Sequence, residues 1–238
     1  MFTPPPVRKQ MFADAAVRKK LRAEAIEDRS PSVFPRRWDV IFVDQVKLAK
    51  NKSFERKSID ELAAAHGKDG LDWFLDISLE EDLETRFVHT NTQGDPEAVC
   101  EILKHPAVRI GQSDAGAHMG YDARFGYSTA FLGRWVRDHR IMSLEEAVNK
   151  LTFRVASIFG LSDRGLLRPG FAADIAVFDP ATVNTLEPEY VRDLPGNETR
   201  MIQKAAGVPH TIVTGEIVIE NGAPTGALPG RVLGRKLN

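Results

Sequence analysis

The residues best suited to chemistry lie in one short run, GQSDAGAH, at positions 111–118. Asp114 directly follows a stretch of β-forming residues, AVRIG, at positions 107–111. Parallel βα folds place their active sites at the carboxyl ends of their strands, which is where this aspartate is expected to lie. A carboxylate there can hold a metal ion or accept a proton from a metal-bound water. The alternative is that Asp114 caps the next turn, a common use of aspartate.

Three further residues are candidates for contacts with a substrate near Asp114. Ser113 precedes Asp114 directly, and His118 lies four positions beyond it. His118 could bind a metal, donate a proton or contact a substrate; the alternative is an ordinary structural or surface histidine. His89 ends an earlier predicted strand, and it faces the same edge as Asp114 if the two strands are neighbours. Otherwise His89 is an ordinary polar residue at a strand end.

The composition excludes several classes of protein. Lys and Arg together number 32 and Asp and Glu 33, so the net charge of −1 gives no electrostatic reason to bind nucleic acid or an anionic membrane. Cys100 is the single cysteine, which rules out a disulfide framework and a cluster of thiolate ligands. No apolar run approaches the roughly 18 residues of a membrane span, and the N-terminus has no signal-peptide core. We therefore expect a cytoplasmic protein that binds neither nucleic acid nor membrane.

Strands alternate with helices in the first two thirds of the sequence, which is typical of βα units and a parallel sheet. The proline-rich residues 1–10 are expected to be extended. Ser58 and Glu61 form a capping box, so a helix should begin there and end at Gly67. We expect strands over 38–46, 86–90 and 107–111, and helices over 12–26, 59–66, 71–79, 97–104, 127–138 and 143–159.

The character of the sequence changes after Gly165, where short β runs are separated by glycine and proline turns. Thr214-Gly215 and Asn221-Gly222 are dipeptides typical of two-residue hairpin turns. Strands are expected over 173–178, 210–213 and 216–219. The predicted domains are therefore 1–165, of α/β character, and 166–238, a small β unit.

Four stretches of the sequence are distinctive when they are taken together. They are GQSDAGAH (111–118), TAFLGRWVRDH (129–139), MSLEEAVNKLTFRVASIFGLSDRGLLRPGFAADIAVFDPATV (142–183) and VPHTIVTGEIVIENG (208–222). These stretches resemble the D-aminoacylase (N-acyl-D-amino-acid deacylase) group of the amidohydrolase superfamily. A weaker similarity to this group extends back to about Phe12.

The resemblance implies a fold and a metal centre. The family folds as a (β/α)8 TIM barrel with a small β-sandwich. The expected fold class is therefore α/β, with the C-terminal part of the metal-dependent hydrolase barrel over 1–165 and part of the sandwich over 166–238. The family binds one or two metal ions, usually zinc, through histidines and an aspartate on strand eight. Asp114 matches that aspartate, which binds metal, accepts a proton from the metal-bound water and passes it to the leaving amine. His118 matches a histidine found in relatives that carry an SDAGAH run.

The chain departs from the family pattern in one large respect. It contains no His-x-His pair, and nothing before Asp114 matches the other metal-binding histidines. We therefore expect a C-terminal fragment or subunit of a zinc-dependent amidohydrolase, acting on the C–N bonds of N-acyl amino acids or related amides. Such a chain should need its N-terminal half or a second copy as a partner. One alternative is a non-catalytic scaffold or interaction protein derived from an amidohydrolase, and another is a small hydrolase that assembles its site from two chains.

Overall fold

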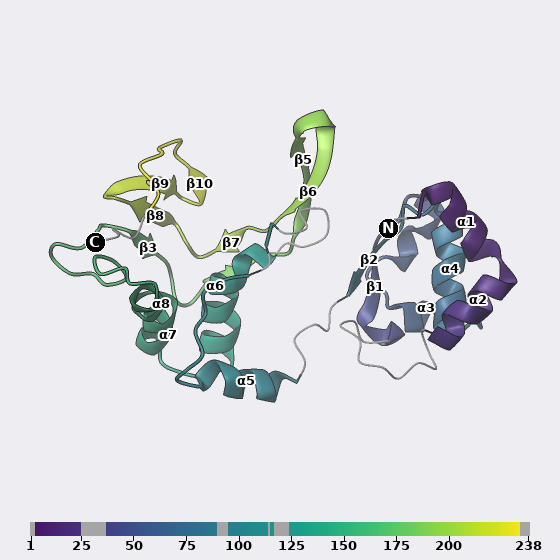
Figure 1. Cartoon of the computed structure of the whole chain (residues 1–238), viewed down its shortest axis with the longest axis horizontal. Helices are drawn as coiled ribbons and strands as arrows, with labels where there is room; N and C mark the ends of the chain where they lie inside the picture. Colours follow the sequence, from purple (N-terminus) through teal and green to yellow (C-terminus); the bar gives the residue numbers. More distant parts are fainter. Residues whose placement is uncertain (1–2, 25–36, 90–94, 114, 117–123, 234–238) are drawn as a thin grey trace. The chain divides into compact units, whose positions relative to one another are not determined.

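The structure is a computed structural model that describes residues 3–24, 37–89, 95–113, 115–116 and 124–233. The chain divides into two compact units, Met1–Gly94 and Asp95–Asn238 (Figure 1). Among the described helices, none combines the length and apolar character that crossing a membrane requires.

The first unit begins with two short helices and continues with strands and helices in alternation. Its elements are α1 (Pro5–Ala13), α2 (Ala15–Arg22), the 3₁₀ turn η2 (Trp38–Val40), β1 (Ile41–Gln45), η3 (Ala49–Phe54), α3 (Ile59–Ala65), α4 (Gly70–Glu80) and β2 (Arg86–His89).

The prediction of an extended N-terminus is wrong, because prolines open α1. Pro5 and Pro6 occupy its first turn, where a missing N–H costs nothing and the fixed φ of proline suits a helix. The single helix predicted over 12–26 is also interrupted. Asp14 ends α1 and caps α2, and its carboxylate accepts hydrogen bonds from the amides of Ala16 (2.7 Å) and Val17 (3.0 Å).

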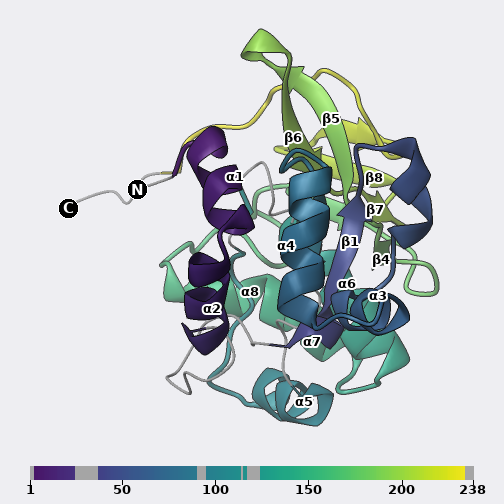
Figure 2. The ribbon, with the colours of Figure 1, turned by 90° about the vertical axis from the view of Figure 1, so that its right-hand side faces the viewer.

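Both opening helices lie beside α4 in Figure 2, and ion pairs hold α2 along it. Arg18 contacts Asp76 at 2.7 Å, and Arg22 contacts Asp69 at 2.9 Å and Asp72 at 2.8 Å. These groups are partly exposed, so each pair contributes little by itself, and the network acts mainly to fix where α2 lies on α4.

The capping box predicted before α3 is confirmed. The amide of Glu61 donates to the Ser58 hydroxyl at 3.1 Å, and the amide of Ser58 donates to the Glu61 carboxylate at 3.3 Å. Gly67 follows the end of the helix with a φ of +63°, the left-handed conformation that favours glycine after a helix. The apolar faces of α3 and α4 pack on β1, forming a core of Val43, Val46, Ile59, Leu62, Ala63, Trp73 and Ile77.

The prediction of parallel strands over this region is wrong, because β1 and β2 pair antiparallel. Ile41 lies opposite His89, and Val43 lies opposite Phe87. A parallel pair is joined by one crossover helix, whereas two successive helices, α3 and α4, stand between these strands. A second helix can return the chain to the end where the first strand finished, and the next strand then runs the other way.

The second unit opens with a layer of helices. They are α5 (Pro96–Lys104), η4 (Arg124–Gly126), α6 (Tyr127–Ala130), the π-helical η5 (Phe131–Asp138), α7 (Leu144–Leu151) and α8 (Phe153–Ile158). The predicted helix over 127–138 is confirmed as α6 continuing into η5. The helix predicted over 143–159 begins as expected, with the Ser143 hydroxyl accepting from the amide of Glu146 at 3.2 Å, but it breaks at Thr152 into α7 and α8.

The β part of the second unit follows these helices. Its elements are β3 (Ile175–Val177), β4 (Asn184–Thr185), β5 (Glu189–Leu194), η6 (Pro195–Asn197), β6 (Glu198–Ile202), β7 (Ala205–Ala206), β8 (His210–Val213), β9 (Glu216–Glu220) and β10 (Ala223–Pro224). One sheet has the order β10-β9-β8-β3, and β5 pairs with β6 in a separate hairpin (Figure 1). Both predicted hairpin turns are confirmed, since Thr214 and Gly215, and likewise Asn221 and Gly222, have positive φ.

A close backbone contact joins the helices to the β part. A Cβ on Gly133 of η5 would lie 2.5 Å from the carbonyl oxygen of Val183, so only glycine allows the helix this close. Arg137, one turn later, donates to the same carbonyl at 2.7 Å. Val183 is buried with Phe131, Leu132, Trp135, Val136, Ile141 and Ala147 in the core of this unit.

Two parts of the predicted architecture are not found among the described residues. The strand predicted over 107–111 does not form, because a strand needs a neighbour and no described segment pairs with it. Every strand pair in the described part of the chain is antiparallel, and these residues form no closed barrel. The mixed helix and strand content agrees with the predicted class, whereas the barrel and the domain boundary at 165/166, which lies inside the second unit, remain predictions.

Candidate functional site

The structure describes two of the four predicted site residues. Asp114 and His118 lie outside the described residues, so their predicted roles remain predictions. Ser113 belongs to the second unit, and His89 belongs to the first.

Ser113 lies in a tight local turn. Its hydroxyl is half-buried and accepts a hydrogen bond from the amide of Ala115 at 3.2 Å, a turn that serine commonly forms with the backbone two residues ahead. Gly116 follows with a φ of +85°, which glycine adopts without strain. The local conformation thus accounts for the serine at position 113 and the glycine at position 116. The bond from Ala115 uses one acceptor site of the hydroxyl and leaves its O–H able to donate to a ligand.

The chain that leads to Ser113 is held by a lysine that the sequence analysis did not select. Lys150 of α7 is completely buried, with 0% exposure. Its ammonium donates to the carbonyl oxygens of Leu103 at 2.6 Å, His105 at 3.0 Å and Val108 at 3.3 Å. Its spacing in the sequence could have indicated this burial, because Lys150 follows the buried Ala147 by three positions and the two residues therefore share one face of a helix.

His89 is a half-buried residue near the end of β2. It pairs with Ile41 across the two strands, and both of its ring nitrogens are shielded from solvent.

In the same unit Glu81 is a buried carboxylate, and the hydrogen bonds that other residues donate to it explain how it can be buried. It accepts from the amides of Lys47 and Leu48 (3.0 Å) and from the side-chain amide of Asn51 (2.5 Å). Glu81 therefore organises the segment before η3, and its acceptor sites are used by the protein itself.

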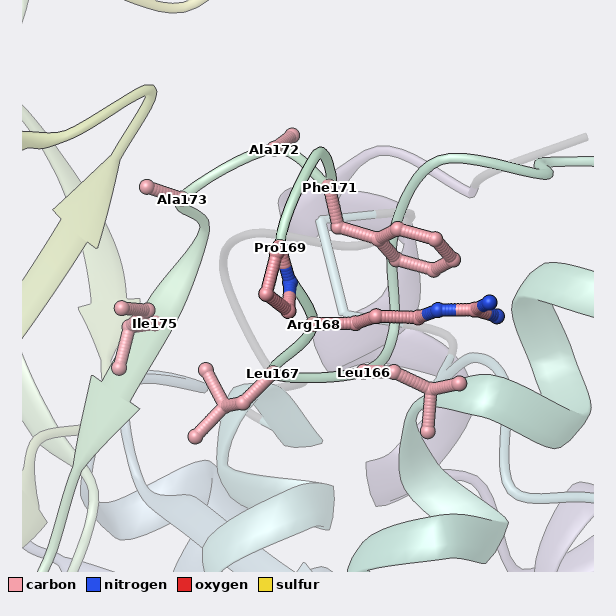
Figure 3. Close-up of a pocket in the computed structure, with 8 residues that line it drawn as sticks. All are labelled: Leu166, Leu167, Arg168, Pro169, Phe171, Ala172, Ala173 and Ile175. Atoms are coloured by element: carbon pink, nitrogen blue, oxygen red, sulfur yellow. The ribbon is translucent and has the colours of Figure 1, made fainter.

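A shallow pocket of about 320 Å³ lies in the loop that leads into β3 (Figure 3). Its lining is apolar apart from Arg168, whose guanidinium lies 5.6 Å from the ring centroid of Phe171. No carboxylate or imidazole lines this pocket. It therefore offers no proton-transfer group, and a hydrolytic role does not fit it. The residues that form it are Leu166, Leu167, Arg168, Pro169, Phe171, Ala172, Ala173 and Ile175.

The described residues do not supply a metal site. A catalytic zinc usually has three protein ligands. Within the part of the chain that the structure describes, no three His, Cys, Asp or Glu side chains are grouped so that they could hold an ion. These residues therefore do not fit the metal centre that the resemblance implies, and no chemical step through a metal is derived from them.

Comparison with known proteins decides the family. The model of the amidohydrolase family matches residues 12–219, which is most of the chain. The chain belongs to the amidohydrolase family. This match includes the run 111–118 and confirms the resemblance predicted from the sequence.

This amidohydrolase chain has both curated relatives and solved neighbours. It is 31% identical over 226 residues to an uncharacterized protein of Mycobacterium tuberculosis, a match that covers 90% of this chain and 36% of the relative. It is 36% identical over 145 residues to the N-acyl-D-glutamate deacylase of Alcaligenes xylosoxydans xylosoxydans, covering 59% of this chain and 27% of that enzyme.

One solved neighbour is a D-aminoacylase studied for its binuclear metal center. The two structures agree with a TM-score of 0.51 at 30% sequence identity, over 82% of this chain and 38% of the neighbour. The chain thus spans about a third of the length of the curated relatives it matches.

Proposed function

We propose that the chain is part of an amidohydrolase that cleaves the C–N bond of N-acyl amino acids or related amides. The observation that carries the proposal is the family match over residues 12–219, which includes the run GQSDAGAH. The likeness to an N-acyl-D-glutamate deacylase and to a D-aminoacylase supports this substrate class.

Asp114 is proposed as the proton-transfer residue. In amide hydrolysis the oxygen of water attacks the carbonyl carbon, and one proton of that water must leave. A carboxylate at position 114 accepts this proton. When the C–N bond breaks, the same group returns the proton to the nitrogen, so that a neutral amine departs.

Ser113, His118 and His89 are proposed as substrate contacts. The geometry of Ser113 supports this role, because its hydroxyl lies beside position 114 in the chain and keeps its O–H available to donate. A substrate carboxylate or carbonyl oxygen is the kind of acceptor that such a donor recognises.

The complete enzyme is proposed to use a divalent metal, zinc, as one or two ions. The binuclear metal center named for the D-aminoacylase neighbour supports a metal of this class. Asp114 is the ligand proposed for this chain. The other ligands are proposed to come from a partner, either an N-terminal half or a second copy, since the described residues hold no set of three.

The test is hydrolysis by the purified chain, measured alone and after mixing with a polypeptide that corresponds to the remaining length of the relatives. N-acetyl-D-amino acids, their L enantiomers and an N-acetyl-D-glutamate substrate are compared, each with and without added Zn²⁺. Turnover of the D series in the mixture supports the proposal. No turnover in any of these mixtures favours a non-catalytic scaffold derived from an amidohydrolase.

A further inference from the structure

Lys150 is a buried cation, and among the described residues its ammonium contacts backbone carbonyls rather than a carboxylate. In the described part of the chain, its Nζ contacts three backbone carbonyl oxygens: Leu103 (2.6 Å), His105 (3.0 Å) and Val108 (3.3 Å). An ammonium has three N–H donors, so these three acceptors match its full capacity.

The three carbonyls belong to the end of α5 and to the irregular segment after it. The last carbonyls of a helix have no partner within the helix, and a positive charge is favourable there. Leu103 lies in the last turn of α5, His105 caps it, and Val108 lies three residues further on. The guanidinium of Arg109 also donates to the carbonyl of Val108, at 3.2 Å. Two cations thus fix the turn by which the chain leaves the helix.

Burial of this lysine is costly, which argues against a purely packing role. Burial lowers the pKa of Lys150, Arg154 and Arg109 lower it further, and Glu146 opposes them. The apolar side chains of Leu103, Ile110 and Leu151 pack against the core of this unit. What an apolar residue cannot do is donate to the three carbonyls.

We infer that Lys150 is a positioning residue that fixes the course of the chain from the end of α5 to Ser113. Val108 is the last residue whose carbonyl Lys150 holds, and Ser113 follows it by five positions and directly precedes Asp114 in the sequence. The structural part of this inference stands without the proposed function. A consequence for catalysis, that Lys150 helps to place Asp114, rests on the proposed function, because it requires Asp114 to act on a substrate.

The test is amide hydrogen exchange in the 238-residue chain with Lys150→Met, a change that keeps an unbranched side chain, one atom shorter, and removes its donors. The amide of Val108, which donates to His105 at 3.1 Å, and that of His105 should exchange about tenfold faster or more, because the turn opens locally. Amides of the β8–β9 hairpin should keep their rates. Lys104→Met is the matched control, since Lys104 is exposed on the same helix end, and it should leave the exchange of Val108 unchanged.

Two further measurements keep the inference testable if Lys150→Met does not fold. Lys150→Arg retains a cation with several donors and should restore part of the protection of Val108. In the unaltered chain, NMR titration should find that Lys150 loses its proton below the pH range that is usual for a lysine, because burial lowers its pKa. Unchanged exchange at Val108 in Lys150→Met, or an equal rise throughout the second unit, would overturn the positioning role. These exchange measurements do not depend on substrate turnover. Failure of the proposed function, which is tested by hydrolysis, is therefore distinguished from failure of the positioning role.

Discussion

At the scale of single residues, the hydrogen-bond partners of three polar side chains indicate which of them stabilise the fold and which could bind a ligand. Glu81 and Lys150 are buried, and each directs all of its hydrogen-bonding groups at partners within the protein. Ser113 is half-buried, and its hydroxyl accepts one bond, from Ala115, while no residue in the described part of the chain accepts from its O–H. A side chain with unused hydrogen-bonding capacity can serve a ligand, whereas a side chain whose capacity is filled serves the fold.

Asp114→Asn tests the proposed proton transfer. Asparagine keeps the shape of aspartate but cannot accept a proton at neutral pH, so kcat should fall by about 10²–10⁴-fold. Stability should change little. His118→Ala is the comparison, and it should raise KM more than it lowers kcat if His118 only contacts substrate. Kinetics of both variants with the reconstituted enzyme, together with their melting temperatures, check this; an Asp114→Asn enzyme with normal kcat contradicts the assignment.

Glu81→Gln tests the structural role of that carboxylate. Glutamine has one oxygen and one NH₂ group, and either orientation places the NH₂ group against an existing donor, Asn51 or the amides of Lys47 and Leu48. An unsatisfied buried donor costs about 1–3 kcal/mol. The Tm of the first unit should therefore fall by roughly 5–15 °C, as measured by circular dichroism. Glu84→Gln changes a carboxylate that is 59% exposed and should shift the Tm only slightly.

At the scale of helices and strands, residues close together in the sequence form the caps and turns that set where several of these elements begin and end. Asp14, Asp69, Asp95 and Ser143 each accept backbone hydrogen bonds at the start of a helix. The same logic gives a pH dependence at α4, because its cap is a carboxylate with a cationic partner.

Asp69 should make the first unit less stable as the solution becomes acidic. Burial alone raises its pKa, but the hydrogen bond from Arg22 and those from the start of α4 outweigh it, and the pKa falls from 3.8 to about 2. The folded state therefore binds this proton less readily than the unfolded state, so the stabilisation is complete above about pH 4 and is lost as the pH falls toward 2. The side chain is 40% exposed, and solvent screening reduces the effect to on the order of 1 kcal/mol.

Asp69→Asn isolates that charge. Asparagine also caps helices well, so the variant should fold, and the fall in stability between pH 4 and pH 2 should become shallower. Urea unfolding of both proteins across this pH range measures the difference. Identical pH profiles would show that the pair with Arg22 contributes nothing.

Gly207→Ala tests a glycine that is required where two loop segments approach each other closely. Gly207 has a φ of +70°, and an added Cβ would lie 2.5 Å from the backbone nitrogen of Val183. Gly222 has a φ of +79° but open space around it. Gly222→Ala should therefore cost only the backbone strain, about 1–2 kcal/mol, whereas Gly207→Ala should cost clearly more. Equal unfolding free energies for the two variants would contradict the packing argument.

At the scale of the whole molecule, the chain spans about a third of its relatives and exposes several large apolar side chains. Phe159 is 72% exposed and Leu167 is 82% exposed, both in the second unit. Single exposed apolar residues are ordinary, so these do not by themselves define an interface. They agree with the proposal that the enzyme is completed by another polypeptide.

The isolated chain should bind zinc weakly. Three protein ligands are usual for a catalytic zinc, and the described residues bring no such set together. Metal analysis after dialysis against a chelator should find well under one zinc per chain, and the mixture with the remaining length of the relatives should retain more. Stoichiometric zinc that resists the chelator in the isolated chain would mean that this chain alone holds a complete site.

The sequence by itself determined the family and the features that depend on neighbouring residues. The capping box at Ser58 and Glu61, the start of α7 at Ser143 and the hairpin turn at Thr214-Gly215 were all predicted, because their hydrogen bonds and φ angles involve residues at most a few positions apart. The run 111–118 was selected as a candidate site for the same reason: its residue types are visible without the fold.

Only the tertiary structure decided which distant segments meet. The antiparallel pairing of β1 with β2 and the absence of a strand at 107–111 both depend on partners far away in the sequence, and β propensity does not name a partner. The burial of Lys150 is of the same kind. A lysine on an amphipathic helix is ordinarily solvated, and here it is buried because the carbonyls of a turn more than forty residues earlier lie within hydrogen-bonding distance of its ammonium.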